Sequence, residues 1–206
     1  QQQKLKGNYF DNFVSLSFDF DKRNQKFQTT QGYRNYFSTD LPLISETNTV
    51  ANTFITTNYF EYFNNYLLKS SFYFRNSNSI SGDNVKLSER LYLPQNRLRG
   101  FEKGKVGPKD GNDFIGGNYI ASLNLSSDIP KILENSQTTD LLIFLDIANV
   151  WGVDYDSSLE SSDEIKSAIG IGLDWFSPIG PMNFSLSQHL SKGSNDITEA
   201  FRFNLG

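Results

Sequence analysis

The chain ends in Phe201-Arg202-Phe203-Asn204-Leu205-Gly206, where apolar and polar residues alternate strictly. Successive side chains of a β-strand point to opposite faces, so the two phenylalanines and Leu205 share one face while Arg202 and Asn204 share the other. Similar segments of about ten residues recur back to Gly116, separated by turn signals. No pattern typical of a helix accompanies them. The repeated alternation predicts a sheet with one face toward lipid and the other toward a wet lumen.

The same alternation extends, more loosely, to the first half of the chain and predicts nine strands. The fourth and fifth strands are separated by a long loop, about 76–115, rich in Gly, Asn, Ser, Lys and Asp. A connection of this length is functional or disordered. The predicted strands are Phe10–Phe20, Gln31–Leu43, Thr49–Phe63, Tyr66–Arg75, Gly117–Ser127, Asp140–Trp151, Glu164–Ser177, Pro181–Leu190 and Thr198–Gly206.

Composition supports this interpretation and excludes several kinds of site. The 206 residues suffice for one domain, and 37% hydrophobic with 15% aromatic residues suits a sheet that needs one apolar face and aromatic girdles. A net charge of −4 without a basic stripe argues against nucleic-acid binding. The absence of cysteine excludes disulfides and thiolate metal sites. Composition alone also fits an aromatic-rich soluble β-sandwich.

Four motifs follow one another in the second half. The long loop contains Arg97-Leu98-Arg99-Gly100-Phe101, a predicted strand contains the segment 144–151 (FLDIANVW), a hairpin spans 167–185, and the terminal segment closes the chain. In this order the motifs resemble the C-terminal half of the barrels of the BamA family of outer-membrane insertases. These barrels share a superfamily with mitochondrial sorting and chloroplast import barrels. The resemblance is strong over about 88–206 and weaker before it.

The resemblance implies an antiparallel transmembrane β-barrel of sixteen strands, of which residues 1–206 supply about the last nine. The family's periplasmic repeats and early strands then lie outside this sequence. It further implies a protein of the Gram-negative outer membrane that inserts and folds β-barrel proteins, without enzymatic activity, cofactor or metal. Its partners would be client outer-membrane β-barrel proteins, accessory assembly lipoproteins and the lipid bilayer, and not nucleic acid.

By the same resemblance, the loop carrying Arg99, Gly100 and Phe101 folds into the lumen, where acidic residues on the wall hold its arginine. Asp146 is the expected acceptor, because it lies on the polar face of its strand and a carboxylate offers bidentate, charge-assisted bonds. The family's second acid corresponds to Asn124, which can accept a hydrogen bond but adds no charge. Gly100 allows unusual backbone torsions, and Phe101 would anchor the loop tip.

The resemblance also implies an unstable seam at the last strand. An unpaired strand edge is a template for another strand, and strand addition is a known recognition mode. The expected seam residues are Phe201, Phe203, Asn204, Leu205 and Gly206.

Other candidates have simpler interpretations. His189, the single histidine, is expected at a surface or interface rather than in catalysis. Gly170 and Gly172 suit a crowded wall position. The acidic residues between the strands ending at 151 and beginning at 164 lack the spacing of a calcium loop, so a solvated external loop is expected; they are Asp154, Asp156, Glu160, Asp163 and Glu164.

Three other functions remain open at this point. One is a related transporter that moves a secreted partner through its pore. The second is a porin-like barrel or adhesin, and the third is a soluble β-sandwich binder.

Overall fold

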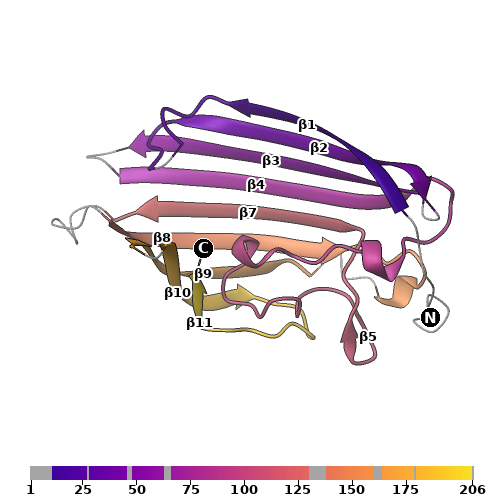
Figure 1. Ribbon diagram of the computed structural model, residues 1–206. Helices are drawn as coiled ribbons and strands as arrows, with labels where there is room; N and C mark the ends of the chain where they lie inside the picture. Colours follow the sequence, from indigo (N-terminus) through magenta and orange to yellow (C-terminus); the bar gives the residue numbers. More distant parts are fainter. Residues whose placement is uncertain are drawn as a thin grey trace.

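A computed structural model of the chain describes residues 11–26, 28–45, 48–62, 66–129, 138–159, 164–178 and 180–205. Nine strands form one antiparallel sheet in chain order, and two short strands form a separate hairpin within the long loop (Figure 1). The strands of the sheet are β1 (Asp11–Asp21), β2 (Gly32–Ser45), β3 (Thr49–Tyr62), β4 (Tyr66–Ser79), β7 (Tyr119–Asp128), β8 (Thr139–Trp151), β9 (Lys166–Ser177), β10 (Gly180–Ser191) and β11 (Phe201–Leu205). The hairpin consists of β5 (Lys109–Asp110) and β6 (Asp113–Phe114).

The prediction of a nine-stranded antiparallel sheet is confirmed, with differences at the strand ends. β4 continues to Ser79, so the long loop begins after that residue rather than at 76. β11 begins at Phe201, three residues later than predicted, because the backbone at Ile197 and Glu199 bonds to the loop instead of to β10. The β5–β6 hairpin was not predicted. The predicted strand ends at positions 10, 63 and 206 lie outside the described residues.

The convex side of the sheet is apolar and exposed, as the alternation predicts. On β11, Phe201, Phe203 and Leu205 are 54%, 45% and 59% exposed, whereas Arg202 between them is 3% exposed. Phe18 on β1, at 70% exposed, is likewise exposed at the opposite end of the sheet. β1 and β11 are the first and last strands in the sheet order, so the described residues form an open trough rather than a closed barrel.

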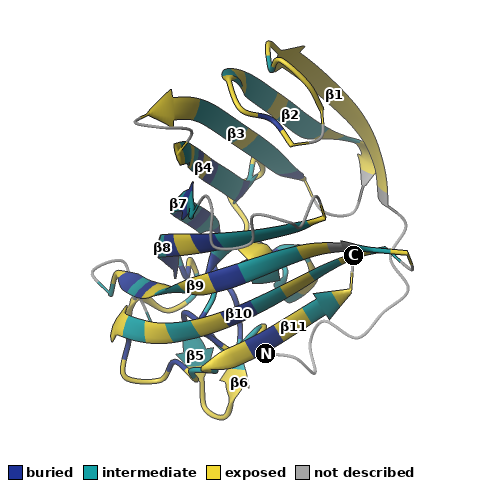
Figure 2. Ribbon diagram, turned by 90° about the vertical axis from the view of Figure 1, so that its left-hand side faces the viewer, coloured by how far each residue is buried: buried dark blue, intermediate teal, exposed yellow. Residues whose placement is uncertain are grey.

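The concave side is only partly polar, because the long loop covers part of it with apolar side chains. Buried residues lie along β7, β8 and β9, whereas β1 is mainly exposed (Figure 2). Alternation alone indicates a polar inner face, and the loop adds an apolar core to it where it docks. The core there combines Leu91, Leu93, Leu98, Phe101 and Val106 of the loop with Tyr73, Ile120, Ala148, Val150 and Ala168 of the wall.

Within the described ranges, helical structure is limited to three short 3-10 turns. They are η2 (Leu87–Glu89), η3 (Gln95–Arg97) and η4 (Ser157–Leu159). None of them approaches the length or apolarity of a membrane-spanning helix.

Candidate functional site

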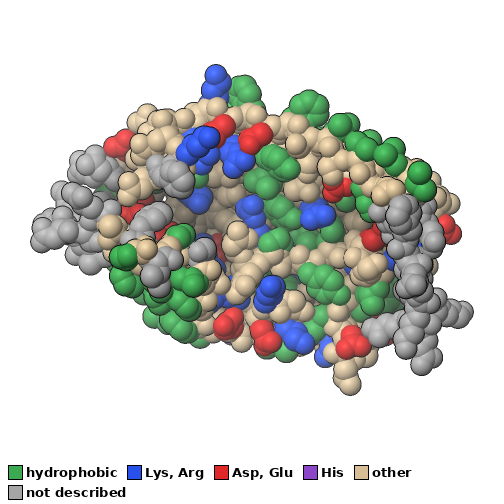
Figure 3. Space-filling view, viewed as in Figure 1, with side chains coloured by type: hydrophobic (Ala, Val, Ile, Leu, Met, Phe, Trp, Pro, Cys, Tyr) green, Lys and Arg blue, Asp and Glu red, His purple; other side chains and the backbone are tan. Residues whose placement is uncertain are grey.

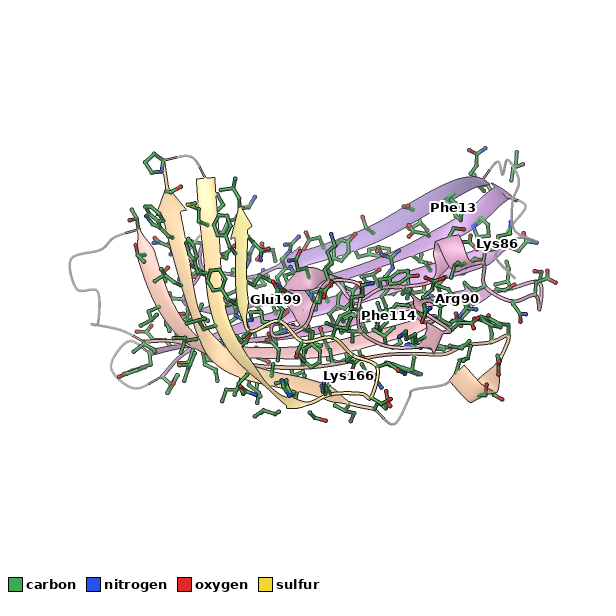
Figure 4. All side chains as sticks on the ribbon, turned by 90° about the horizontal axis from the view of Figure 1, so that it is seen from below. Phe13, Lys86, Arg90, Phe114, Lys166 and Glu199 are labelled. Carbon is green, nitrogen blue, oxygen red and sulfur yellow. The ribbon has the colours of Figure 1, made fainter. Side chains whose placement is uncertain are left out.

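The long loop crosses the concave side of the sheet from the end of β4 to the start of β7. Arg90 and Phe114 of this loop lie inside the trough, and so does Glu199 of the β10–β11 connection (Figure 4). A backbone bridge between Leu91 and Gly117 ties the start of the loop to its end, with N–O distances of 2.8 and 2.9 Å. The loop is thus a folded element that carries its central motif to the wall.

Arg99 binds Asp146 on β8 through three hydrogen bonds. Its Nε and Nη2 atoms donate to the two carboxylate oxygens at 2.7 and 2.8 Å, and its backbone N–H donates to Oδ2 at 3.0 Å. Asp146 is fully buried and Arg99 is 22% exposed. The guanidinium carbon also lies 3.4 Å from the ring centroid of Phe144, two residues earlier on β8. A bidentate pair with a stacked ring fixes both the position and the orientation of the arginine.

Asn124 on β7 joins this pair as a donor, not as the acceptor that was expected. Its Nδ2 donates to Asp146 Oδ1 and to the backbone carbonyl of Arg97, both at 2.8 Å. An amide supplies N–H groups that a carboxylate lacks, so Asn124 completes the hydrogen bonding of the buried carboxylate without adding a second charge. We call Arg99, Asp146 and Asn124 the arginine clasp.

Gly100 and Phe101 bring the loop tip against the wall. Gly100 has φ of +89°, and a Cβ there would lie 3.0 Å from Cβ of Ala168 on β9, so both its torsion and its contact favour glycine. Phe101 is 1% exposed within the apolar core. The loop therefore presents a polar anchor at Arg99 and an apolar anchor two residues later.

Arg97 lies beside the arginine clasp without entering it. Its guanidinium carbon is 4.7 Å from the ring centroid of Tyr73, and Nη1 donates to Ser71 Oγ at 3.0 Å. Burial lowers the pKa of the Arg97 guanidinium, although Tyr73 and Asp146 act in the opposite direction. Figure 3 shows lysine and arginine side chains together with hydrophobic ones on this loop-bearing face.

The last strand also contacts the loop, through a residue that the sequence did not single out. Arg202 donates from Nη1 to the carbonyl of Gln95 at 2.7 Å, from Nη2 to the carbonyl of Phe101, and from Nε and Nη2 to Glu199 Oε2 at 3.3 and 3.0 Å. Of the expected seam residues, Phe203 packs against Phe184 of β10 with ring centroids 5.0 Å apart. Asn204 pairs with Asn183, and Gly206 lies outside the described residues.

A second ion pair holds the other end of the loop and corrects one prediction. Asp154, expected in a solvated external loop, accepts hydrogen bonds from Arg90, from the Val85 backbone N–H at 2.7 Å and from Asn118 Nδ2 at 3.0 Å. Burial raises the pKa of the Asp154 carboxyl, but these hydrogen bonds and the Arg90 charge outweigh it, so the pKa lies below its usual value. No sequence spacing indicated this pair.

The remaining candidates stay apart from these contacts. His189 lies on β10 and is partly exposed. Glu160 and Asp163 lie outside the described residues. Among the residues that the structure describes, no group of three or more His, Asp or Glu side chains is placed to hold a metal ion.

Comparisons with known proteins agree with this geometry. The chain is 27% identical over 128 residues to the outer membrane protein assembly factor BamA of Neorickettsia risticii, covering 61% of this chain and 17% of the relative. It is 30% identical over 129 residues to a SAM50-like protein of Schizosaccharomyces pombe, covering 58% of this chain and 26% of the relative. The chain therefore spans only about a fifth of the length of these curated relatives.

A solved structure shows the same fold. It is the crystal structure of BamA from Haemophilus ducreyi lacking POTRA domains 1–3, with a TM-score of 0.85, 24% identity, and coverage of 92% of this chain and 41% of that chain. The Omp85 superfamily domain matches residues 1–206, the whole of the sequence. The chain belongs to the Omp85 superfamily.

Proposed function

We propose that this chain is part of the barrel of an outer-membrane protein assembly factor, which inserts and folds β-barrel proteins into the outer membrane. The observation that carries the proposal is the arginine clasp beside an open terminal strand, in an Omp85 chain whose relatives include proteins named as BamA. Clients would be β-barrel proteins presenting an extended strand. The accessory assembly lipoproteins that the resemblance implies stay a prediction, because no described surface is assigned to them.

The convex side supports a location within a bilayer. Strands β1–β4 and β7–β10 have 10 to 14 residues, against the roughly 9–11 that a tilted strand needs to cross the hydrocarbon core. Phenylalanine, leucine and isoleucine side chains on this side stay largely exposed among the described residues, and hydrocarbon would cover them at no cost.

The outer edge of β11, which has no partner strand among the described residues, supports a strand-pairing function. In lipid, an edge with unpaired N–H and C=O groups is expensive, so pairing with an incoming client strand is favourable. No step of this mechanism needs nucleotide or covalent chemistry, since the free energy comes from backbone hydrogen bonds and apolar burial.

Arg99→Ala in the full-length protein tests the proposal. The variant and the wild type are reconstituted in vesicles, and the rate at which an unfolded client barrel becomes protease-resistant is measured. We expect a slower rate for Arg99→Ala and an unchanged rate for Arg34→Ala, which removes another inner-wall arginine that is paired with Asp19 at 2.6 Å. Unchanged client assembly with altered conductance alone would favour a pore and overturn the proposal.

A further inference from the structure

The last strand is held by its neighbour over only part of its length. β10 has twelve residues and β11 five, and the two pair from Met182–Leu205 to Leu186–Phe201. One further bond runs from Ser187 N–H to the Ala200 carbonyl at 2.8 Å. Beyond it, the chain leading into β11 leaves the edge of β10.

That lead-in segment pairs with the loop instead. Glu199 N–H donates to the Gly100 carbonyl at 3.0 Å, Glu102 N–H donates to the Ile197 carbonyl at 2.9 Å, and Ile197 N–H donates to the Lys105 carbonyl at 3.1 Å. These bonds surround an antiparallel bridge between Phe101 and Thr198. Buried Asp196 extends the contact by accepting from Gly107 N–H at 3.0 Å. The loop tip thus replaces β10 as the hydrogen-bonding partner.

Arg202 then attaches β11 itself to the same loop. Its guanidinium, 3% exposed, bridges the carbonyls of Gln95 and Phe101 and is held in orientation by Glu199. We call Arg202, Glu199 and these two carbonyls the seam tether. Because Phe101 follows the clasp residue Arg99 by two positions, the seam tether and the arginine clasp hold neighbouring residues of one loop tip.

The geometry of the seam tether specifies a register. A one-residue slip of β11 against β10 would turn Arg202 to the convex side and Phe201 or Phe203 to the concave side. The guanidinium could then reach neither carbonyl, and a buried cation would lose its partners. Five paired residues specify register weakly by themselves, so the loop supplies the missing constraint.

We propose that Arg202 is a positioning residue that fixes the register of β11 through the loop, and so couples the outer edge of that strand to the arginine clasp. What the edge binds, an extended client strand, rests on the proposed function. The seam tether itself concerns only this chain and is tested separately.

The first experiment measures the seam tether directly in the full-length protein. Spin labels are placed at Lys103, exposed on the loop, and at Leu205, exposed on β11, since residues 1–206 contain no native cysteine. We expect one narrow distance distribution in the wild type and in Arg34→Ala, and a broad one in Arg202→Ala. Arg202→Lys, which keeps the charge but lacks the planar fork, should be intermediate. An equally narrow distribution in folded Arg202→Ala would overturn the proposal.

The second experiment measures coupling by a double-mutant cycle on client insertion. Arg99→Ala and Arg202→Ala should each slow insertion by roughly tenfold, the loss that corresponds to one charge-assisted hydrogen bond. If both residues act through one loop tip, the double variant inserts clients no more slowly than the slower single variant. For Arg34→Ala with Arg202→Ala, by contrast, the two fold-changes in insertion rate should multiply. Multiplicative effects of Arg99→Ala and Arg202→Ala would refute the coupling.

The two readouts separate the two proposals. If Arg202→Ala broadens the distances while no variant alters client insertion, the seam tether stands and the proposed function fails. If Arg99→Ala slows insertion while Arg202→Ala leaves both readouts unchanged, the function stands and the seam tether is wrong. Gel mobility before and after heating confirms that each variant compared is a folded barrel.

Discussion

Phe144 and Gly170 face each other across β8 and β9, and the Phe144 ring occupies the space that a side chain at residue 170 would need. A Cβ there would lie 2.5 Å from Cζ of Phe144 and 2.2 Å from the carbonyl oxygen of Leu186. The ring in turn lies beneath the Arg99 guanidinium. The glycine therefore gives Phe144 its position, and Phe144 supports the arginine clasp.

Gly170→Ala is expected to displace the Phe144 ring and β10, and to destabilise the barrel by about 1–3 kcal/mol, as overpacking does. The midpoint of urea unfolding in detergent measures this. The control is Gly104→Ala, because no heavy atom lies within 4 Å of a Cβ at Gly104, although its φ of +72° adds some strain. A Gly170→Ala midpoint as high as that of Gly104→Ala would contradict the steric account.

Asp146→Asn should release the loop tip. The substitution places an amide N–H₂ group opposite the N–H donors of Arg99 and Asn124. It also leaves a partly buried cation without its counter-charge, which should lower the stability of the docked loop by about 3 kcal/mol. Trypsin cleavage after Arg97 and Arg99 in the folded barrel reports the release and should become faster. Asp19→Asn, which removes an exposed carboxylate bonded to Arg34, should leave the cleavage rate unchanged. Equal rates for wild type and Asp146→Asn would show that the arginine clasp does not hold the loop.

Asn124→Asp should loosen the loop more than Asn124→Ala does. The new carboxylate oxygen would replace Nδ2 and face two acceptors, Asp146 Oδ1 and the Arg97 carbonyl, that now lie at 2.8 Å. Alanine loses the same donors without adding repulsion between like charges. The trypsin assay ranks the variants. A fully protected Asn124→Asp protein would mean that an arginine has moved to bridge both carboxylates.

The start of the loop should loosen in acid. The pKa of Asp154 in the folded state lies below its ordinary value of 3.8, so its stabilising contribution is fully present above that value and is lost as the pH falls through the folded-state pKa. Amide hydrogen exchange at Val85, whose N–H donates to Asp154, should lose protection below about pH 4. The Leu91 amide, which donates to the backbone carbonyl of Gly117, is the matched control.

Asp154→Asn supplies the second half of this test. Without a titrating carboxyl, protection at Val85 should be low and independent of pH from acid to neutral conditions. A Val85 amide that keeps its pH dependence in Asp154→Asn would assign the effect to another group.

Period-two alternation was sufficient to predict the strands of the sheet, because one face must be apolar and the other must not. It could not predict where β11 begins. Residues 198–200 alternate like a strand, yet the backbone at Thr198 and Glu199 pairs with the loop, and alternation does not identify the partner of a backbone N–H. The β5–β6 hairpin has a local signal in Asp110-Gly111-Asn112-Asp113, a turn sequence between two strands of two residues each, which are too short to show alternation.

For the site, the resemblance indicated Arg99 and Asp146, and the structure brings these two residues together. Asn124 was identified by position but its role as a donor was not, because hydrogen-bond direction depends on which atoms face each other. Arg202 and Asp154 could not be found in this way. Each is an ordinary charged residue of a strand or loop, and its partners lie 101 and 64 positions away, at Phe101 and Arg90.

The apolar underside of the loop has a consequence for how such a wall is built. β7, β8 and β9 carry a strip of apolar residues on the concave side that, within the described ranges, is covered by the loop, so without the loop the sheet would be apolar on both faces there. If the barrel closed before the loop docked, this apolar strip would face the water of the lumen. The loop between β4 and β7, about forty residues long, would then have to enter a confined space. We therefore expect the loop to dock before the barrel closes, and a chain whose loop docks late to persist as an open sheet with an exposed apolar strip.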